Sequence, residues 1–271
     1  MSRVMATDGY LLANQNIEAG ARFEALAEIF DPVTFAHFDR IGVGPGWHCW
    51  EVGAGGTSVI YGLADRVGEN GRILATDIDA SWAERASERA PIEVRKHDVS
   101  KDPLPEGKYD LVHARLVLVH VPDRQTALEN MVAALKPGGW LLIEDADPAL
   151  QPLACINPNS PEEVLANRLR SAFRSLMIER GADLEYGRKL PHLLRAIGLQ
   201  NVGADGYFPL GLPACNVLEI ATMKLVASQL LQAGLAVQSE IDEHIDNISR
   251  GRLVLTLAPM ISAWGQKRNV E

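Results

Sequence analysis

The sequence predicts an α/β protein with a doubly wound, mostly parallel sheet. Short apolar runs bounded by glycine, proline or polar residues alternate with helix-like segments, an order typical of right-handed βαβ units. A glycine-rich turn, Gly53-Ala54-Gly55-Gly56, follows the first of these runs. The 271 residues are 47% hydrophobic and 23% charged. That balance fits one large or two small globular domains and excludes a disordered or collagen-like chain.

The first part of the chain alternates between helix and strand. Residues 19–30 place Phe23, Leu26 and Phe30 on one helical face, and Asp31-Pro32 is expected to end or restart that helix. Five short apolar runs are predicted as strands, at residues 48–52, 72–78, 92–96, 109–114 and 140–144. Helical segments are predicted at residues 57–67, 82–89 and 122–135, and Lys136-Pro137-Gly138-Gly139 breaks the last of them.

After Asp147 the pattern changes, because four prolines interrupt the chain between residues 148 and 161. Residues 162–179 are strongly amphipathic, and we interpret them as an inserted helix that roofs the site. On this helix, Phe173 and Met177 are expected to be core or dimer contacts, and residues 208–210 to add an apolar wall to the acceptor pocket. The remaining predicted elements are a helix at 187–197, a strand at 201–207, a long helix at 217–233 and a last strand at 257–266.

Composition narrows the class of protein. Acidic residues outnumber basic ones by 35 to 26, a formal net charge of −9, which argues against a protein that coats nucleic acid or an anionic membrane. Three widely spaced cysteines without a C-x-x-C pair define neither a disulfide framework nor a zinc site and favour a reducing cytoplasm. No export signal is expected at the N-terminus. The apolar stretch 217–235 contains Glu219, Lys224 and Gln229, so we interpret it as a buried or partner-facing helix.

The glycine-rich turn is the main chemical signal. Glycines let a backbone turn tightly and approach a ligand closely, and a helix N-terminus offers free N–H groups. On its own, such a turn is also compatible with an ordinary strand-to-helix connection. Asp77 ends the second predicted strand, 24 residues after Gly53, where nucleotide-binding βαβ units place a carboxylate that accepts from ribose hydroxyls. Asp98 ends the third strand, where it can accept from an adenine amino group, although an isolated aspartate more often caps a turn or helix.

The type of adenosine cofactor follows from the rest of the motif. A dinucleotide fingerprint needs glycine or alanine at its sixth position, where this chain has Ser58. An acidic residue, then G-x-G, with further acidic residues after strands two and three, resembles the class I S-adenosylmethionine-dependent methyltransferases over roughly residues 41–145. Residues 109–115 resemble that family's fourth strand, whose end faces the methyl group, and residues 135–140 resemble the turn before its fifth. The family's last strand runs antiparallel between the fifth and sixth, and residues 260–265 are the candidate.

The resemblance implies cofactor contacts at the ends of the first four strands. The residues concerned are Glu51, Gly53, Ala54 and Gly55 against the methionine part, Thr57 near its carboxylate, Asp77 and Ile78 on ribose and adenine, Asp98 and Val99 around adenine, and the backbone carbonyl of His113 near the methyl group. Thr57 departs from the family, which often has a third glycine there, and this leaves the pose of the cofactor open.

Two histidines are candidate catalytic residues. Methyl transfer is an in-line displacement that depends mostly on alignment in a water-poor pocket. When the acceptor is a hydroxyl or an ammonium, a base must take up a proton, and histidine is suited to this near neutral pH. His120 and His113 both lie close in sequence to the expected methyl position. For each, a packed or capping histidine is an equally good interpretation.

Substrate contacts are expected from three places. In similar small-molecule methyltransferases the residues before the core form helices that close over the cofactor, which would bring Tyr10, Asn14 and Arg22 to the site. A surface charge for Arg22 and a packed aromatic for Tyr10 are the alternatives. Arg115 and Asp145 are further candidates from the ends of strands four and five. Acidic residues 144, 145 and 147 together could bind a substrate or, with a histidine, a divalent ion, but a solvated loop is the simpler interpretation and no metal is predicted.

The sequence therefore predicts a cytoplasmic methyltransferase that uses S-adenosyl-L-methionine to methylate O, N or C of a small organic metabolite of specialised biosynthesis. One alternative is a protein that keeps the cofactor but catalyses a rearrangement or cyclisation, or only binds; another is a nicotinamide oxidoreductase. Neither nucleic acid nor a membrane is an expected partner, whereas a homodimer is compatible with the sequence. The expected parts are an N-terminal helical lid (1–40), a cofactor-binding core (41–147), a helical cap with the following core helix (148–200), and the remainder of the sheet with a long helix (201–271).

Overall fold

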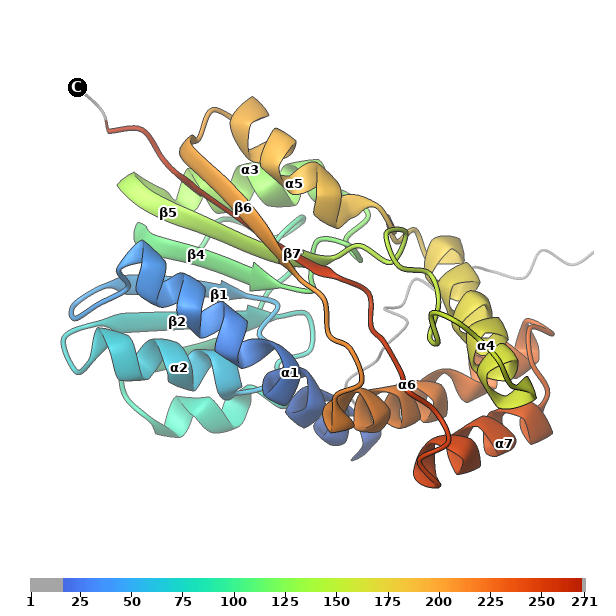
Figure 1. Ribbon diagram of the computed structural model, residues 1–271. Coiled ribbons are helices and arrows are strands. Elements are labelled where there is room, and N and C mark those ends of the chain that lie inside the picture. Colours follow the sequence, from blue (N-terminus) through green and yellow to red (C-terminus); the bar gives the residue numbers. More distant parts are fainter. Residues whose placement is uncertain (1–16, 270–271) are drawn as a thin grey trace, which may run out of the picture.

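The computed structural model describes residues 17–269, which contain a seven-stranded sheet. Its strands lie in the order β3-β2-β1-β4-β5-β7-β6 (Figure 1). Strands β1 to β5 run parallel, and β7 runs antiparallel to both of its neighbours. The bounds are His48–Val52 (β1), Arg72–Asp77 (β2), Ile92–Lys96 (β3), Tyr109–Arg115 (β4), Leu135–Ala146 (β5), Gln200–Tyr207 (β6) and Met260–Gln266 (β7). The predicted doubly wound sheet with an antiparallel last strand is confirmed.

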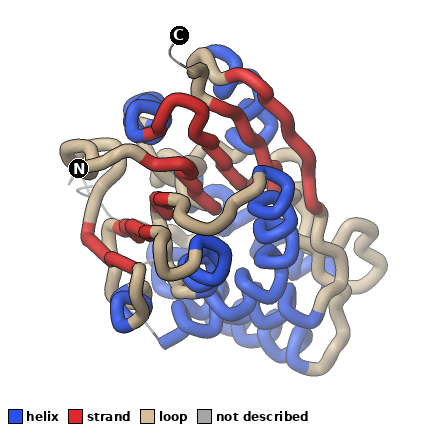
Figure 2. The backbone as a smooth tube through the Cα atoms, turned by 90° about the vertical axis from the view of Figure 1, so that its left-hand side faces the viewer, coloured by secondary structure: helices blue, strands red, loops and turns tan. Residues whose placement is uncertain are grey.

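Helices cover both faces of this sheet (Figures 1 and 2). One face carries α1 (Ile17–Ile41) and α2 (Ser58–Val67), and the other carries α3 (Arg124–Ala134) and α5 (Tyr186–Ala196). A short 3-10 helix, η1 (Glu84–Glu88), stands where the sequence predicts a helix over residues 82–89.

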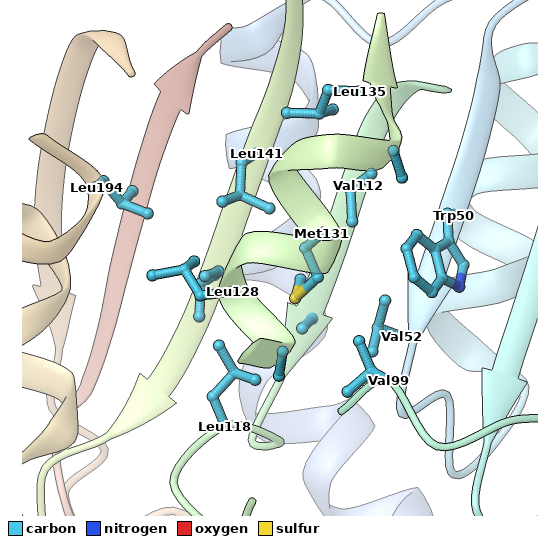
Figure 3. Close-up of a cluster of buried hydrophobic side chains, with 14 of the residues drawn as sticks. Trp50, Val52, Val99, Val112, Leu118, Leu128, Met131, Leu135, Leu141 and Leu194 are labelled. Atoms are coloured by element: carbon cyan, nitrogen blue, oxygen red, sulfur yellow. The ribbon is translucent and has the colours of Figure 1, made fainter. Parts of the chain in front are cut away.

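Buried apolar side chains join α3 to the strands. In Figure 3, Leu128 and Met131 of α3 lie against Val112 of β4 and Leu141 of β5, and Trp50 of β1 lies on the same side of the sheet. None of the five is more than 1% exposed. Burial of a large apolar side chain stabilises a fold by roughly 1.5–3 kcal/mol. The continuous apolar runs in the sequence are therefore strands that are covered on both faces.

Helix α1 continues through Pro32, so the expectation that Asp31-Pro32 ends or restarts it is wrong. A proline ring fixes φ at a helical value but removes one backbone hydrogen bond, at a cost of about 3 kcal/mol. Contacts on both sides of the proline offset this cost. Ile29 and Phe38 are at most 2% exposed, and polar groups further along the helix bond to the sheet, as described below.

Strand β5 begins earlier than predicted. Leu135 pairs with Tyr109 and Trp140 pairs with Leu111, so the four residues 136–139 form an irregular insertion within the strand. Gly138 in this insertion has a φ of 77°, which favours glycine. The predicted break at residues 136–139 is therefore a bulge at the start of β5.

Three further helices gather beyond the carboxyl ends of the parallel strands (Figure 1). They are α4 (Pro161–Glu179), α6 (Pro213–Gln232) and α7 (Gln238–Ser249). Ser160 and Glu163 form a capping box at the start of α4. Helix α7 is absent from the sequence prediction, because its buried face includes the polar His244 and Asn247 beside Ile241 and Ile248.

Helix α6 is long and apolar enough to cross a bilayer by length and composition alone, but 56% of its most apolar 18-residue stretch is buried inside the protein. Its one buried carboxylate, on Glu219, accepts from Arg170 of α4 at 2.7 Å and lies 3.3 Å from His244 of α7. Such pairing is what allows a charge to be buried. The acidic residue in this apolar stretch therefore joins the three helices.

Candidate functional site

A cavity of about 670 Å³ lies at the carboxyl ends of the parallel strands. Open α/β sheets bind their ligands at this edge. The described residues that line it come from six segments: Arg22, Phe23 and Leu26 of α1; Glu51 to Gly56, Ser58 and Val59; Asp77 and Ile78; His97 to Lys101; Arg115 to Val117 and His120 to Pro122; and Met177, Glu179, Arg180 and Ala182 after α4.

The glycine-rich turn forms one wall of this cavity. Gly53 and Gly55 have φ values of 66° and 56°, a region that side chains other than glycine rarely adopt. A Cβ on Gly53 would lie 2.3 Å from Val117, and one on Gly55 would lie 2.6 Å from the ring of Phe23. The turn therefore requires glycine for its own backbone and for the close approach of two side chains from elsewhere in the chain.

Asp77 ties this turn to the second strand. Its Oδ2 accepts from the backbone N–H of Gly55 at 2.9 Å, and its Oδ1 accepts from that of Asp79 at 2.9 Å. Burial raises the pKa of Asp77, against these two hydrogen bonds, which lower it. Next to it, Ile78 is apolar but 48% exposed on the cavity wall. A carboxylate beside an uncovered apolar side chain suits a ligand with both hydroxyl groups and a flat apolar ring.

The third strand contributes Asp98 and Val99 to the same cavity. The Asp98 carboxylate accepts from the backbone and hydroxyl of Ser100 and lies 3.1 Å from Lys101 Nζ. These contacts outweigh burial and lower the pKa of Asp98. The sequence expectation that residues 77, 78, 98 and 99 meet at one site agrees with this geometry.

His120 lines the cavity close to two arginines. Burial lowers the pKa of His120 well below its usual value, and Arg22 and Arg124 lower it further. The imidazole is therefore neutral near pH 7, the form that accepts a proton. Arg22 is 9% exposed and also lines the cavity, and its Nε has no hydrogen-bond partner in the described part of the chain. A buried guanidinium of this kind favours a negatively charged ligand.

Arg115, the second expected substrate residue that lines the cavity, is already paired. Its Nη1 donates to Asp31 at 2.8 Å and to Thr34 at 3.0 Å, both on α1. It therefore joins α1 to the end of β4, and its charge is balanced before any ligand binds.

His113 lies elsewhere than the catalytic expectation requires. It is fully buried, it is not among the described residues that line the cavity, and each ring nitrogen faces a carboxylate, that of Glu51 or of Glu144. Burial lowers its pKa, but the two carboxylates outweigh burial and raise the pKa to about 9. An imidazolium in such a position is a poor base near pH 7.

Asp145 and its neighbours also differ from the expectation. Glu144, Asp145 and Asp147 are all 0% exposed, so the interpretation of a solvated loop is wrong. Asp147 is paired with Arg188 at 2.6 Å. Asp145 accepts hydrogen bonds from the backbone of Leu118 and Val119 and does not line the cavity. Among residues 17–269, no group of three or more His, Cys, Asp or Glu side chains could hold a metal ion.

Other expectations have separate outcomes. Thr57 stands at the start of α2 but does not line the cavity, whereas Ser58 does. Residues 208–210 do not form an apolar wall there, and Leu210 is 52% exposed and bridges to Thr256. Met177 is buried, as expected, and also lines the cavity. Tyr10 and Asn14 lie outside the described residues.

Sequence reasoning missed several cavity residues. Phe23 is on the predicted apolar face of α1, but nothing local shows that its ring covers the glycine turn. Leu116 follows β4 with a φ of 58°, a conformation that costs about 1–3 kcal/mol in residues other than glycine. Strain of this kind is common at functional sites, and only the folded backbone shows it. Arg180 reaches the site from the end of α4, far along the chain.

Comparison with known proteins agrees with this geometry. Residues 50–143 match the model of a methyltransferase domain. By sequence, these residues are a methyltransferase domain. The chain is 47% identical over 45 residues to methyltransferase str3 of Strobilurus tenacellus, a match that covers 17% of this chain and 16% of that protein. The first relatives are thus matched over less than two thirds of their own length.

Two longer matches extend beyond the domain. The ubiquinone/menaquinone biosynthesis C-methyltransferase UbiE of Laribacter hongkongensis is 28% identical over 165 residues, which cover 54% of this chain and 68% of that protein. The solved structure of Haemonchus contortus phosphoethanolamine N-methyltransferase 2 in complex with S-adenosyl-L-methionine has a TM-score of 0.58 and 14% identity, and the match covers 98% of this chain and 59% of that one. This second likeness concerns the fold.

The cavity of the methyltransferase domain fits an aminoacyl nucleoside. The exposed side of Ile78 offers an apolar surface to a flat base, and the Asp77 carboxylate at the wall is an acceptor suited to ribose hydroxyls. Glu51 lies at the same wall and suits a cationic group. The residues that line the cavity therefore fit S-adenosyl-L-methionine, the methyl donor that the sequence resemblance implies.

Proposed function

We propose that this protein transfers a methyl group from S-adenosyl-L-methionine to oxygen, nitrogen or carbon of a small organic acceptor. One observation carries the proposal: the glycine turn, Asp77, Asp98 and His120, which are distant in sequence, line one cavity of about 670 Å³. That volume is in the range of sites for small molecules. Together these groups supply a binding place for a nucleoside and, beside it, the His120 imidazole as a proton acceptor.

When bound, the cofactor supplies an electrophilic methyl group on a sulfonium. Asp77, Ile78, Asp98 and Val99 would hold its nucleoside, and Glu51 and the glycine turn its amino-acid part. The chain's own contribution is alignment and exclusion of water, which can account for a large part of the rate enhancement of a displacement. Phe23 covers the glycine turn and assists in this exclusion.

We assign the role of base to His120 rather than to His113. His120 lines the cavity and is neutral near pH 7, so it can accept a proton, but its lowered pKa makes it a weak base for a hydroxyl or ammonium acceptor. Arg22 lies in the same region and is available to bind an acidic group. For His113 we propose a role in holding the cofactor, either through its backbone carbonyl or through the Glu51 carboxylate.

The wider setting follows from the sequence. We propose a cytoplasmic enzyme of specialised metabolism that acts on neither nucleic acid nor membranes, given the net charge of −9. We further propose that residues 1–40 act as a lid, 41–147 as the cofactor-binding core, 148–200 as a cap with a core helix, and 201–271 as the rest of the sheet. Met177 at the end of α4 lines the cavity, which supports the cap.

The test is methyl transfer itself. The purified protein is incubated with methyl-labelled S-adenosyl-L-methionine and a panel of phenols, carboxylic acids, amines and quinols, and label in each acceptor is counted. Transfer to at least one acceptor is expected, together with its loss in Asp77→Ala. Cofactor binding with turnover of an acceptor but without labelled product would favour a rearrangement or cyclisation instead. No cofactor binding would contradict the proposal.

A further inference from the structure

A row of polar side chains crosses the sheet beneath α1. It consists of Glu51 (β1), His113 (β4), Glu144 (β5), Ser262 (β7) and Asp205 (β6), and we refer to it as the polar row. Glu51 and His113 are register partners, as are Glu144 and Ser262, and Ser262 and Asp205. The first member lies at the cavity wall and the last on the edge strand. Most other buried side chains of this sheet are apolar, so a connected row of polar groups across it needs a physical reason.

Side-chain contacts join Glu51, His113, Glu144 and Ser262 of the polar row. His113 Nδ1 lies 2.5 Å from Glu51 Oε2, and His113 Nε2 lies 3.4 Å from Glu144 Oε2. Ser262 Oγ donates to Glu144 Oε1 at 2.9 Å. Apart from Asp205, whose side chain is 42% exposed, no member is more than 2% exposed.

Helix α1 lies on the polar row with a polar stripe of its own. Asp31, Thr34, His37 and Arg40 recur every third residue, and each bonds toward the sheet. Thr34 donates to Glu144, and His37 Nδ1 lies 2.9 Å from the same carboxylate. At the edge of the sheet, the Asp205 carboxylate contacts His37 at 3.0 Å and Arg40 at 2.9 Å. The helix that carries Arg22 and Phe23 to the cavity is thus docked by charge.

The charges along this path alternate in sign. Burial lowers the pKa of His113 and of His37, but their carboxylate neighbours outweigh burial and raise both. Burial raises the pKa of Glu144, but hydrogen bonds from His113, His37 and Thr34 outweigh it and lower that pKa well below its usual range. Each buried charge is therefore balanced by its neighbours, and loss of one leaves the next uncompensated.

Stability alone does not account for the polar row. Apolar side chains of similar volume often stabilise a core as well as buried ion pairs do. The row does, however, connect two parts of the cavity wall: Glu51, and the α1 segment with Phe23 against Gly55. Fixing both parts of the wall in place is a reason to bury four charged or polar groups.

We propose that His113 and Glu144 are positioning residues for the cofactor site, acting through the Glu51 carboxylate and through the docking of α1. The proposal rests on the proposed function, because the group that Glu51 meets is taken to be the cationic amino-acid part of the cofactor. The charged or titratable groups that face His113 are Glu51 from β1, Glu144 from β5 and, beyond Glu144, His37 from α1. Burial raises the pKa of Cys49, on the same strand as Glu51, so that thiol stays neutral.

The test measures binding of S-adenosylhomocysteine by calorimetry between pH 6.5 and 9.5. The proteins are the wild type, Glu144→Gln, the double variant His113→Gln with Glu144→Gln, and Asp39→Asn. Asp39 is an exposed acid of α1 paired with Arg66 outside the polar row, so its variant is the matched control. The double variant removes one charge of each sign and keeps the core neutral overall.

We expect Glu144→Gln and the double variant to bind the ligand about tenfold or more weakly at pH 7, and Asp39→Asn to bind as the wild type does. The wild-type affinity should also show a pH step near 9 that the double variant lacks. The ligand's own amine titrates in every sample, so a difference between the profiles belongs to His113. Wild-type affinity in a folded double variant, or parallel pH profiles, would overturn the positioning role.

A measurement on the wild type needs no variant to fold. The pKa of His113 is followed by NMR of 15N-labelled imidazoles with and without S-adenosylhomocysteine. A cation that meets Glu51 competes with the imidazolium, so binding should lower the pKa of His113. Saturating ligand with an unchanged pKa would overturn the inference while leaving the proposed function intact. Absence of any binding would instead contradict the proposed function.

Discussion

Replacement of Asp145 by asparagine should stabilise this protein at neutral pH. Asp145 is 0% exposed on β5, and its Oδ2 accepts from the backbone N–H of Val119 at 3.2 Å. Its Oδ1 has no hydrogen-bond partner among the described residues. Burial is the main cause that raises the pKa of Asp145, to about 8, against backbone hydrogen bonds and Arg124. The carboxyl group is therefore protonated at pH 7 in the folded protein and ionised in the unfolded chain.

The size and sign of the effect follow from linkage. Because the folded-state pKa is the higher one, the group's contribution to stability is fully present below the unfolded pKa of about 3.8 and is lost as the pH rises through 8. At pH 7 the wild type therefore loses about 4 kcal/mol relative to acid conditions. Asparagine has nearly the same shape and does not titrate, so Asp145→Asn avoids this loss. We expect the difference in the free energy of unfolding between Asp145→Asn and the wild type to grow by about 2–4 kcal/mol from pH 4.5 to pH 7.5.

Urea unfolding at pH 4.5, 6, 7.5 and 8.5 measures this gain. Asp65→Asn serves as the control, because the Asp65 carboxylate is 66% exposed and its replacement should give a small difference that hardly depends on pH. A difference between Asp145→Asn and wild type that stays constant over this pH range, or that shrinks as the pH rises, would refute the reasoning.

Three further predictions concern the cavity. Gly53→Ala places a Cβ 2.3 Å from Val117 at a φ of 66°, so urea unfolding should show a loss of about 1–3 kcal/mol; an unchanged midpoint would contradict the strain. Asp77→Ala should weaken binding of S-adenosylhomocysteine about tenfold to a hundredfold in calorimetry, and equal affinity would remove Asp77 from the site. His120→Ala should lower turnover of a hydroxyl or amine acceptor by about a hundredfold or more while sparing cofactor affinity; normal turnover at every pH would leave this histidine a structural role.

Local signals explain why so much of the fold is predictable from the sequence. Strands β1 and β3 have the predicted bounds. In β1 the run of side chains is buried on both faces, and such a run is visible without any tertiary partner. The continuation of α1 through Pro32, in contrast, could not be predicted from the local sequence. It depends on contacts of His37 with Glu144 and Asp205, 107 and 168 residues away, and local propensity does not contain them.

The residues of the candidate site also fall into a group that the sequence predicts and a group that it does not. The glycine turn, Asp77 and Asp98 were predictable because each stands at the end of its own strand, and parallel strands bring such ends together. The burial of His113 and Asp145 was not, because β4 and β5 end in residues that alternate between faces, and only the sheet register decides which face meets α1. Phe23 and Met177 reach the cavity through helix packing that no motif records.

The central claim is that the turn after β1 receives an aminoacyl nucleoside, and a crystal structure of the protein grown with S-adenosylhomocysteine tests it most directly. The account predicts the ribose hydroxyls on the Asp77 carboxylate, the adenine between Ile78 and Val99, and the sulfur toward His120. Density for the ligand on another face of the protein, or a ribose that leaves Asp77 without contact, would contradict it.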